Sequence, residues 1–126
     1  MNVLDASAVL AILQQEAGAD EVVQRLNGSI MSTVNLTEVL QQAQKRGLDP
    51  RDVHAELGNL GVGFVAFDLE QTLDAAELWE STRRQGLSLA DRACLALTMA
   101  VSGVAVTADR AWGQLELGGC DIHLIR

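Results

Sequence analysis

Short apolar runs alternate with longer stretches of helical periodicity along the whole chain, and this alternation limits the fold more than any other feature. The pattern predicts strands at residues 1–4, 29–32, 62–67, 104–107 and 122–125. It predicts helices at residues 7–16, 19–26, 33–46, 70–84 and 89–101, with one more that starts at Asp49-Pro50. Parallel neighbours need crossover connections of this kind. The sequence therefore predicts one α/β domain, residues 1–126, with a central parallel sheet of about five strands flanked by helices.

Composition favours a soluble protein of the cytoplasm. The chain is 48% hydrophobic, and its most apolar stretch, residues 93–108, is shorter than the roughly 20 residues of a membrane span. Two cysteines are too few for a disulfide framework, and no basic leader precedes the first strand. We therefore expect cytoplasmic localisation and no membrane contact.

The net charge of −8 disfavours nonspecific binding to nucleic acids or anionic membranes. Only two tryptophans and two phenylalanines are present, with no tyrosine, so a base-stacking platform is not expected either. A nucleic-acid substrate would have to be held by a local site against the overall charge.

Acidic residues lie where predicted elements begin or end. Asp5 directly follows the first strand and Asp109 closely follows the fourth. Ligand sites of open parallel sheets form at these carboxyl ends. Asp91 lies in the first turn of the apolar helix before the fourth strand, a position that simple crossover geometry does not tie to the same edge. Glu38 lies one turn inside its helix and shares a face with Asn35.

Each acid also has an ordinary structural explanation. Asp5 and Asp109 suit the N-caps of the helices that follow them. Ser88 and Asp91 have the spacing of a capping box, and Glu38 suits a solvated helix face. The spacing alone leaves open whether the four acids converge.

Four segments carry a family resemblance: residues 3–8 (VLDASA), 32–39 (STVNLTEV), 86–97 (GLSLADRACLAL) and 106–112 (VTADRAW). In this order and spacing they resemble the PIN-domain ribonucleases, and most closely the VapC-type toxins of bacterial toxin–antitoxin pairs. The resemblance implies a three-layer PIN-like fold in which the family's four acidic positions fall on Asp5, Glu38, Asp91 and Asp109. These acids would bind Mg²⁺ or Mn²⁺ and hydrolyse RNA phosphodiester bonds.

Carboxylates are the ligands that such chemistry needs. Mg²⁺ and Mn²⁺ prefer carboxylate oxygens, and divalent ions supply both an activated water and positive charge for the transition state. Two unneutralised carboxylates about 4 Å apart repel by roughly 4 kcal/mol at an effective dielectric near 20, which a cation relieves. We expect Asp5 and Asp91 to be the dominant ligands, completed by Glu38 and Asp109 directly or through water.

Polar neighbours of these acids are candidates for supporting roles. Ser7 and Thr107 would supply hydroxyls beside the ligands, and Asn35 would orient Glu38.

Four arginines are candidate contacts to RNA phosphates. Arg92 and Arg110 each follow a proposed ligand, and Arg83 and Arg84 end a helix just before Gly86. The alternatives are a favourable interaction with the helix dipole for Arg83 and Arg84, and ordinary surface solvation for the others.

The resemblance further implies a homodimer and a small antitoxin protein. Candidate dimer surfaces are residues 22–26 and the side chains of Leu36, Val39 and Leu40. An arginine from the antitoxin's tail would pair with the carboxylates and displace the metal ion.

Two other functions compete with the nuclease. A non-catalytic PIN scaffold would bind protein or RNA, but the intact set of four acids argues against it. A phosphate-handling receiver or aspartyl phosphatase would also be an α/β domain. A receiver needs a lysine after a late strand, whereas the only lysine is Lys45, and the phosphatase needs an aspartate where Ser7 stands.

Overall fold

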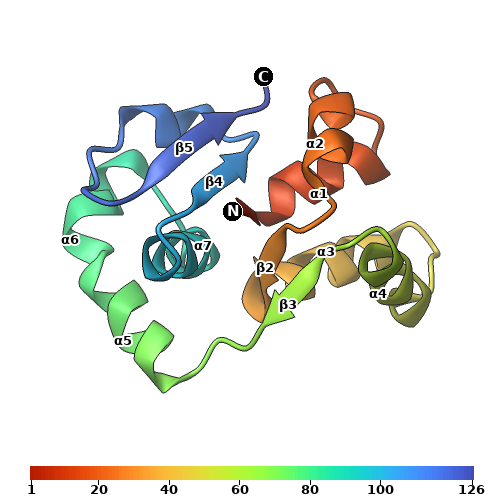
Figure 1. Cartoon of the computed structure of the whole chain (residues 1–126), viewed down its shortest axis with the longest axis horizontal. Coiled ribbons are helices and arrows are strands. Elements are labelled where there is room, and N and C mark those ends of the chain that lie inside the picture. Colours follow the sequence, from red (N-terminus) through yellow and green to blue (C-terminus); the bar gives the residue numbers. More distant parts are fainter.

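The sheet in the computed structural model, which covers residues 1–126, has five parallel strands in the order β3-β2-β1-β4-β5 (Figure 1). The strands are β1 (Asn2–Leu4), β2 (Ile30–Ser32), β3 (Gly63–Val65), β4 (Val104–Thr107) and β5 (Asp121–Leu124). The first strand of the chain is the central strand, since Val3 pairs with Ile30 on one side and with Ala105 on the other. The topology therefore changes direction at β1, and a crevice opens at such a point.

Helices make all the connections except the last, which contains only a 3₁₀ helix. They are α1 (Ala6–Leu13), α2 (Ala19–Arg25), α3 (Thr33–Lys45), α4 (Pro50–Asn59), α5 (Leu69–Glu77), α6 (Trp79–Thr82) and α7 (Leu89–Ala100), with 3₁₀ helices η1 (Arg83–Gln85) and η2 (Arg110–Gln114). The predicted start signals act as expected, because Asp49 caps α4 and Ser88 forms a capping box with Asp91. No helix combines the length and the apolar character that crossing a bilayer requires.

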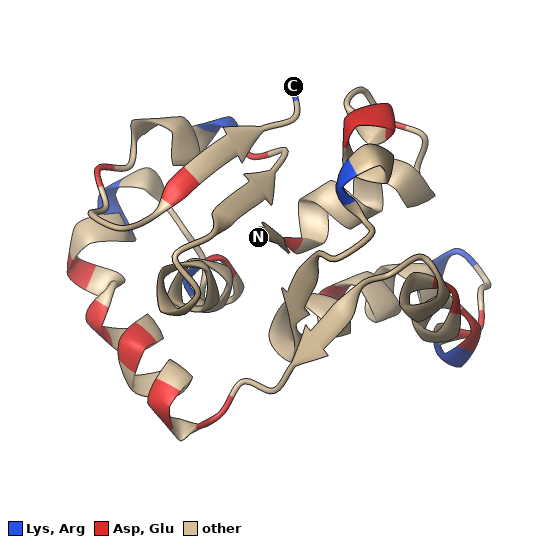
Figure 2. Ribbon diagram, viewed as in Figure 1, with Lys and Arg blue, Asp and Glu red and all other residues tan.

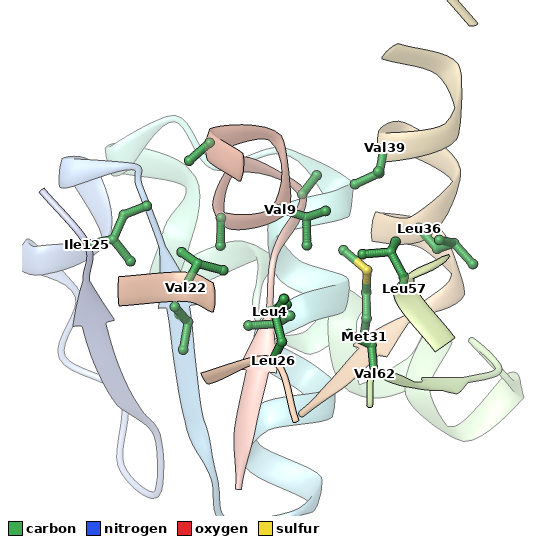
Figure 3. Close-up of a cluster of buried hydrophobic side chains, with 14 residues drawn as sticks. Leu4, Val9, Val22, Leu26, Met31, Leu36, Val39, Leu57, Val62 and Ile125 are labelled. Atoms are coloured by element: carbon green, nitrogen blue, oxygen red, sulfur yellow. The ribbon is translucent and has the colours of Figure 1, made fainter. Parts of the chain in front are cut away.

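Alternating side chains of the central strands divide the interior into two cores. Leu4 and Val106 belong to the core beneath α1–α4, which Figure 3 shows. Val3 and Ala105 belong to the other core, with α5, α7 and η2. Since strand side chains point alternately to opposite faces, each short strand serves both cores. The three-layer α/β fold predicted from the sequence is confirmed.

The single helix predicted for residues 70–84 is wrong in detail. The chain forms α5, α6 and η1 in succession, with the first break at Leu78. The hydroxyls of Ser81 and Thr82 donate to the Leu78 carbonyl at 3.3 and 2.6 Å. Such bonds compete with the regular helix ladder and accompany bends.

The apolar side chains proposed for a dimer surface lie mostly inside the protein. Four of them are buried in the first core: Val22, Leu26, Leu36 and Val39. Leu40 is half-buried against the same core. The core absorbs these five groups because α2 and α3 both pack against α1, so they cannot form a dimer surface. Of the proposed segment 22–26, Val23 is exposed. Other large exposed apolar groups include Leu69, Leu73 and Trp79 on α5 and α6.

Candidate active site

Asp5 sits in the crevice beside the central strand and is held from three sides. It follows β1 and is the N-cap of α1, where its Oδ1 accepts from the Ala8 amide at 2.9 Å. The Ser7 hydroxyl donates to the same oxygen at 2.7 Å, and the Thr107 hydroxyl donates to Oδ2 at 2.5 Å. With 3% of its surface exposed, Asp5 is a buried carboxylate in a fixed orientation.

Burial raises the pKa of Asp5 from 3.8 to about 6. The hydrogen bonds from Thr107, Ser7 and Ala8 favour the ionised form and limit this rise, whereas the nearby charge of Asp91 adds to it. The ionised Asp5 is thus under electrostatic strain, and a cation in the crevice would relieve it.

The Ser7 and Thr107 hydroxyls also link Asp5 to the loop after β4. Ser7 Oγ accepts from the Ala108 amide at 2.9 Å, and Thr107 Oγ1 accepts from the Asp109 amide at 3.1 Å. The structure therefore places both hydroxyls against Asp5 and fixes the backbone that carries Asp109.

Asp91 reaches the same edge of the sheet from the start of α7. The expectation that crossover geometry does not tie Asp91 to this edge is wrong, because a helix that returns between parallel strands runs antiparallel to them and begins near their carboxyl ends. Within the capping box, Asp91 Oδ2 accepts from the Ser88 amide at 2.9 Å. Burial raises the pKa of Asp91, and the charge of Asp109 raises it further, while Ser88 and Arg92 lower it.

Glu38 lies on α3, half-buried, with Asn35 one turn before it. Burial raises the pKa of Glu38 and the charge of Asp91 adds to this, whereas the Asn35 amide lowers it. Asn35 is 1% exposed, and its Nδ2 donates to the carbonyl of Ala90 at 3.0 Å. The Asn35 side chain thus ties α3 to the first turn of α7, one residue before Asp91, and its Oδ1 is buried without a partner.

All four acids line one open pocket of about 280 Å³. Its walls are Asp5, Ala6, Ser7, Leu10, Glu38, Gln41, Gln42, Asp91 and Asp109. As the side chains stand, no three acids are grouped closely enough to form a complete metal site. The donor chemistry nevertheless fits a hard divalent cation, because every charged group in the wall is a carboxylate and three of them have raised pKa values.

Two pocket residues escaped the sequence analysis. Gln41 and Gln42 follow Glu38 by three and four positions, so they share its side of α3. The helical spacing was the available signal. Their amides bring both donors and acceptors to a wall otherwise made of acids.

None of the four arginines proposed to contact phosphate lines this pocket. Arg83 pairs with Glu80 at 3.4 Å and lies over the ring of Trp79. Arg92 donates to the Leu87 carbonyl at 2.9 Å. Arg84 and Arg110 are exposed and make no ion pair. Contacts from these arginines to RNA outside the pocket stay a prediction.

Comparison with known proteins places the chain in a family. Residues 3–116 match the PIN domain family. The chain belongs to the PIN domain family. No curated protein matches it significantly. The resemblance to PIN domains is thereby confirmed over nearly the whole chain.

Several solved structures share the fold of this chain. A toxin–antitoxin complex from Klebsiella pneumoniae has a TM-score of 0.79 at 12% identity, covering 100% of this chain and 98% of the other. DNA-bound VapBC from Salmonella typhimurium has a TM-score of 0.72 at 16% identity, covering 99% and 98%. VapC20 from Mycobacterium tuberculosis, a Sarcin-Ricin loop cleaving toxin, has a TM-score of 0.71 at 16% identity, covering 92% and 97%. At these identities the likeness shows the fold.

Proposed function

We propose that this PIN domain is a metal-dependent endoribonuclease and the toxin of a toxin–antitoxin pair. The proposal is carried by one observation: four acids from distant parts of the chain line a single pocket at the carboxyl edge of the sheet. The PIN family match supports the same function, as do structures with this fold that include a toxin–antitoxin complex, VapBC and the toxin VapC20.

Asp5 and Asp91 would be the main ligands of Mg²⁺ or Mn²⁺, with Glu38 and Asp109 completing the site. A bound divalent cation supplies positive charge to the scissile phosphate and makes a nearby water more acidic. Carboxylates with raised pKa values are suited to this task because a cation lowers the free energy of their ionised forms.

The chain's own residues would divide the remaining work. Hydrogen bonds from Ser7 and Thr107 hold the Asp5 carboxylate in one orientation. Glu38 is half-buried on α3. Glu38 would orient a water and accept its proton, which its raised pKa favours. The water oxygen forms a new bond to phosphorus, the bond to the leaving ribose oxygen breaks, and that oxygen takes a proton from solvent.

The partners follow from the same proposal. A small antitoxin would place an arginine from its tail in the acidic pocket, and the toxin would form a homodimer. Co-expression with the neighbouring gene tests the first: recovery of the PIN domain alone and fully active contradicts it. Light scattering tests the second, and a mass of 13.5 kDa at micromolar concentration contradicts it.

Incubation of the purified protein with mixed RNAs, with and without Mn²⁺ and a chelator, tests the central reaction. We expect cleavage with Mn²⁺ and none with the chelator. Cleavage that a chelator does not affect contradicts the metal dependence. Binding of RNA without cleavage under any metal condition favours the non-catalytic scaffold instead.

A further inference from the structure

The positive charges of this acidic protein are unevenly distributed over its surface. The chain has nine lysines and arginines. Of these, Arg83 and Arg126 pair with glutamates, and Arg25 and Arg92 donate to neutral oxygens. Three of the remaining five gather where α3 ends and α4 begins: Lys45, Arg46 and Arg51. Figure 2 shows these blue segments beside the last turn of α3 and the first turn of α4.

Lys45 lies farther along α3 than the residues of the acidic pocket and lines neither hollow. Glu38, Gln41 and Lys45 are spaced by three and then four residues, so they form one row on the exposed side of the helix. At 1.5 Å per residue, Lys45 lies about 10 Å along the axis from Glu38. A strand whose scissile phosphate sits in the pocket would therefore present a neighbouring phosphate to Lys45.

A second groove begins where the acidic pocket ends. It has a volume of about 460 Å³, lies between α3 and α4, and shares Gln41 with the pocket wall. Arg51 and His54 line it from α4. The two hollows are thus adjacent, one lined by carboxylates and the other by a guanidinium and an imidazole.

The acids of α4 are turned away from this groove. Val53 and Leu57 face the protein interior, and His54 and Arg51 flank them on one side. Asp52 and Glu56, four residues apart, lie on the opposite flank by helical geometry. Asp49 is nearer, but its Oδ1 accepts from the Arg51 amide at 2.9 Å as the cap of α4. Arg51 is therefore the only formally charged residue that lines the groove.

We propose that Lys45, Arg51 and His54 form a binding surface for the phosphates of single-stranded RNA that flank the cleavage point. This inference rests on the proposed function and extends it to the path of the substrate. The strand runs from the acidic pocket over Gln41 into the groove between α3 and α4. The amides of Gln41, Gln42 and Gln44 bridge the two charged regions without adding charge of either sign.

The salt dependence of RNA binding tests this surface. We would compare the wild type with the double variant K45Q/R51Q, using an end-labelled, mixed-sequence single-stranded RNA, a chelator to prevent turnover, and a series of KCl concentrations. Loss of two phosphate contacts lowers the slope of log K against log salt by about 1.4, and the affinity by about 10-fold or more near 0.1 M KCl. An unchanged slope and affinity, or a wild type that does not bind RNA, would overturn the inference.

The matched control is R25Q/R126Q, which also removes two positive charges but lies on α2 and at the end of the chain rather than on α3 and α4. We expect it to keep the wild-type slope. Equal losses in both double variants would mean that only net charge matters, and the inference would be wrong. A polyglutamate peptide serves as a second probe: if K45Q/R51Q loses affinity for the peptide but not for RNA, the surface binds an acidic protein instead.

Turnover separates this inference from the proposed function. With Mn²⁺, K45Q/R51Q should raise KM for the RNA and leave kcat near the wild-type value, because phosphates outside the pocket contribute uniform binding. If the wild type binds RNA with the expected slopes but never cleaves it, the proposed function fails and the surface stands. If the wild type cleaves RNA and the slopes are equal, only the surface fails.

Discussion

The two halves of the acidic pocket are built in different ways. Asp5 is 3% exposed and accepts hydrogen bonds from two hydroxyls and an amide. Asp91 and Glu38 are half-buried and Asp109 is exposed, with fewer contacts to fix them. The fixed Asp5 carboxylate cannot shift toward a ligand in the pocket, whereas the side chains of the other three acids can. In the proposed function, the buried half would set where a cation sits, and the open half would adjust around it.

The largest effect is expected from Asp5→Asn, which neutralises the buried half. Cleavage with Mn²⁺ should fall by more than about 100-fold, beyond the loss typical of groups behind a metal ligand. Wild-type cleavage rates in Asp5→Asn, measured with Mn²⁺ in excess, would contradict the claim that the buried carboxylate contributes most to cleavage.

The pH dependence of stability should change in the same variant. Because the folded pKa of Asp5 is about 6 against an ordinary 3.8, the native state binds more protons than the unfolded state in this window. Stability of the metal-free wild type should therefore decline as pH rises from about 4 to 6, by about 3 kcal/mol at most from this group. Denaturant unfolding across this window should show a smaller decline in Asp5→Asn than in the wild type, because the raised pKa values of Asp91 and Glu38 still contribute.

Asp91→Asn tests the open half. The amide keeps the shape and can still accept from Ser88, so folding should survive while Mn²⁺ affinity and cleavage fall by about 100-fold. Relief of carboxylate repulsion should keep the metal-free Tm at or above the wild-type value. Asp52→Asn is the matched control, because Asp52 holds the same position in the first turn of α4 and is exposed. A loss of cleavage in Asp52→Asn equal to that in Asp91→Asn would contradict a specific role.

Thr107→Val tests whether the hydroxyl bond to Asp5 is needed for the buried half of the pocket to function. Without this donor the pKa of Asp5 should rise further, shifting the acidic limb of the pH–rate profile upward and lowering activity by about 10- to 100-fold. Thr98→Val is the control, since Thr98 is equally buried but donates only to the Cys94 carbonyl within α7. A pH profile that Thr107→Val leaves unshifted would show that the hydroxyl only supports packing.

The smallest effect is expected from Asp109→Asn. Asp109 is exposed and its Oδ1 also caps η2 by accepting from the Ala111 amide at 3.0 Å, a role that asparagine can keep. Solvent screens its charge, so we expect less than about a 10-fold loss of cleavage and an unchanged Tm. A loss of cleavage as large as that of Asp5→Asn would contradict the expectation that the exposed carboxylate contributes least to cleavage.

Local signals explain why much of the fold was predictable. The proline and aspartate at the start of α4, and the pairing of Ser88 with Asp91, are fixed by bonds within a few residues. The broken helix after Leu69 was not predictable in the same way, because hydroxyl bonds to the Leu78 carbonyl compete with an otherwise helical pattern. The misplaced dimer surface has a tertiary cause, since spacing shows which side chains share a face but not what covers that face.

The candidate site likewise contains residues that local sequence signals placed and residues that they did not. Asp5 and Asp109 were placed by strand ends, which the sequence marks clearly. Convergence of Asp91 with Glu38 depends on how α3 meets α7, and the bond from Asn35 to the Ala90 carbonyl spans 55 residues. The family resemblance supplied that convergence, and the residues alone did not. The sequence likewise did not indicate that the groove with Arg51 and His54 adjoins the acidic pocket, since this depends on how α3 and α4 pack.

The position of β1 also has a consequence during synthesis. The bond between Thr107 and Asp5 joins residues separated by 102 positions, and β4 is the neighbour that completes the central strand on its second side. A growing chain therefore carries Asp5 and Glu38 long before the Thr107 hydroxyl that orients Asp5 has been added, and Asp91 precedes that hydroxyl by 16 residues. The order of the strands thus delays assembly of the pocket until most of the chain has been translated.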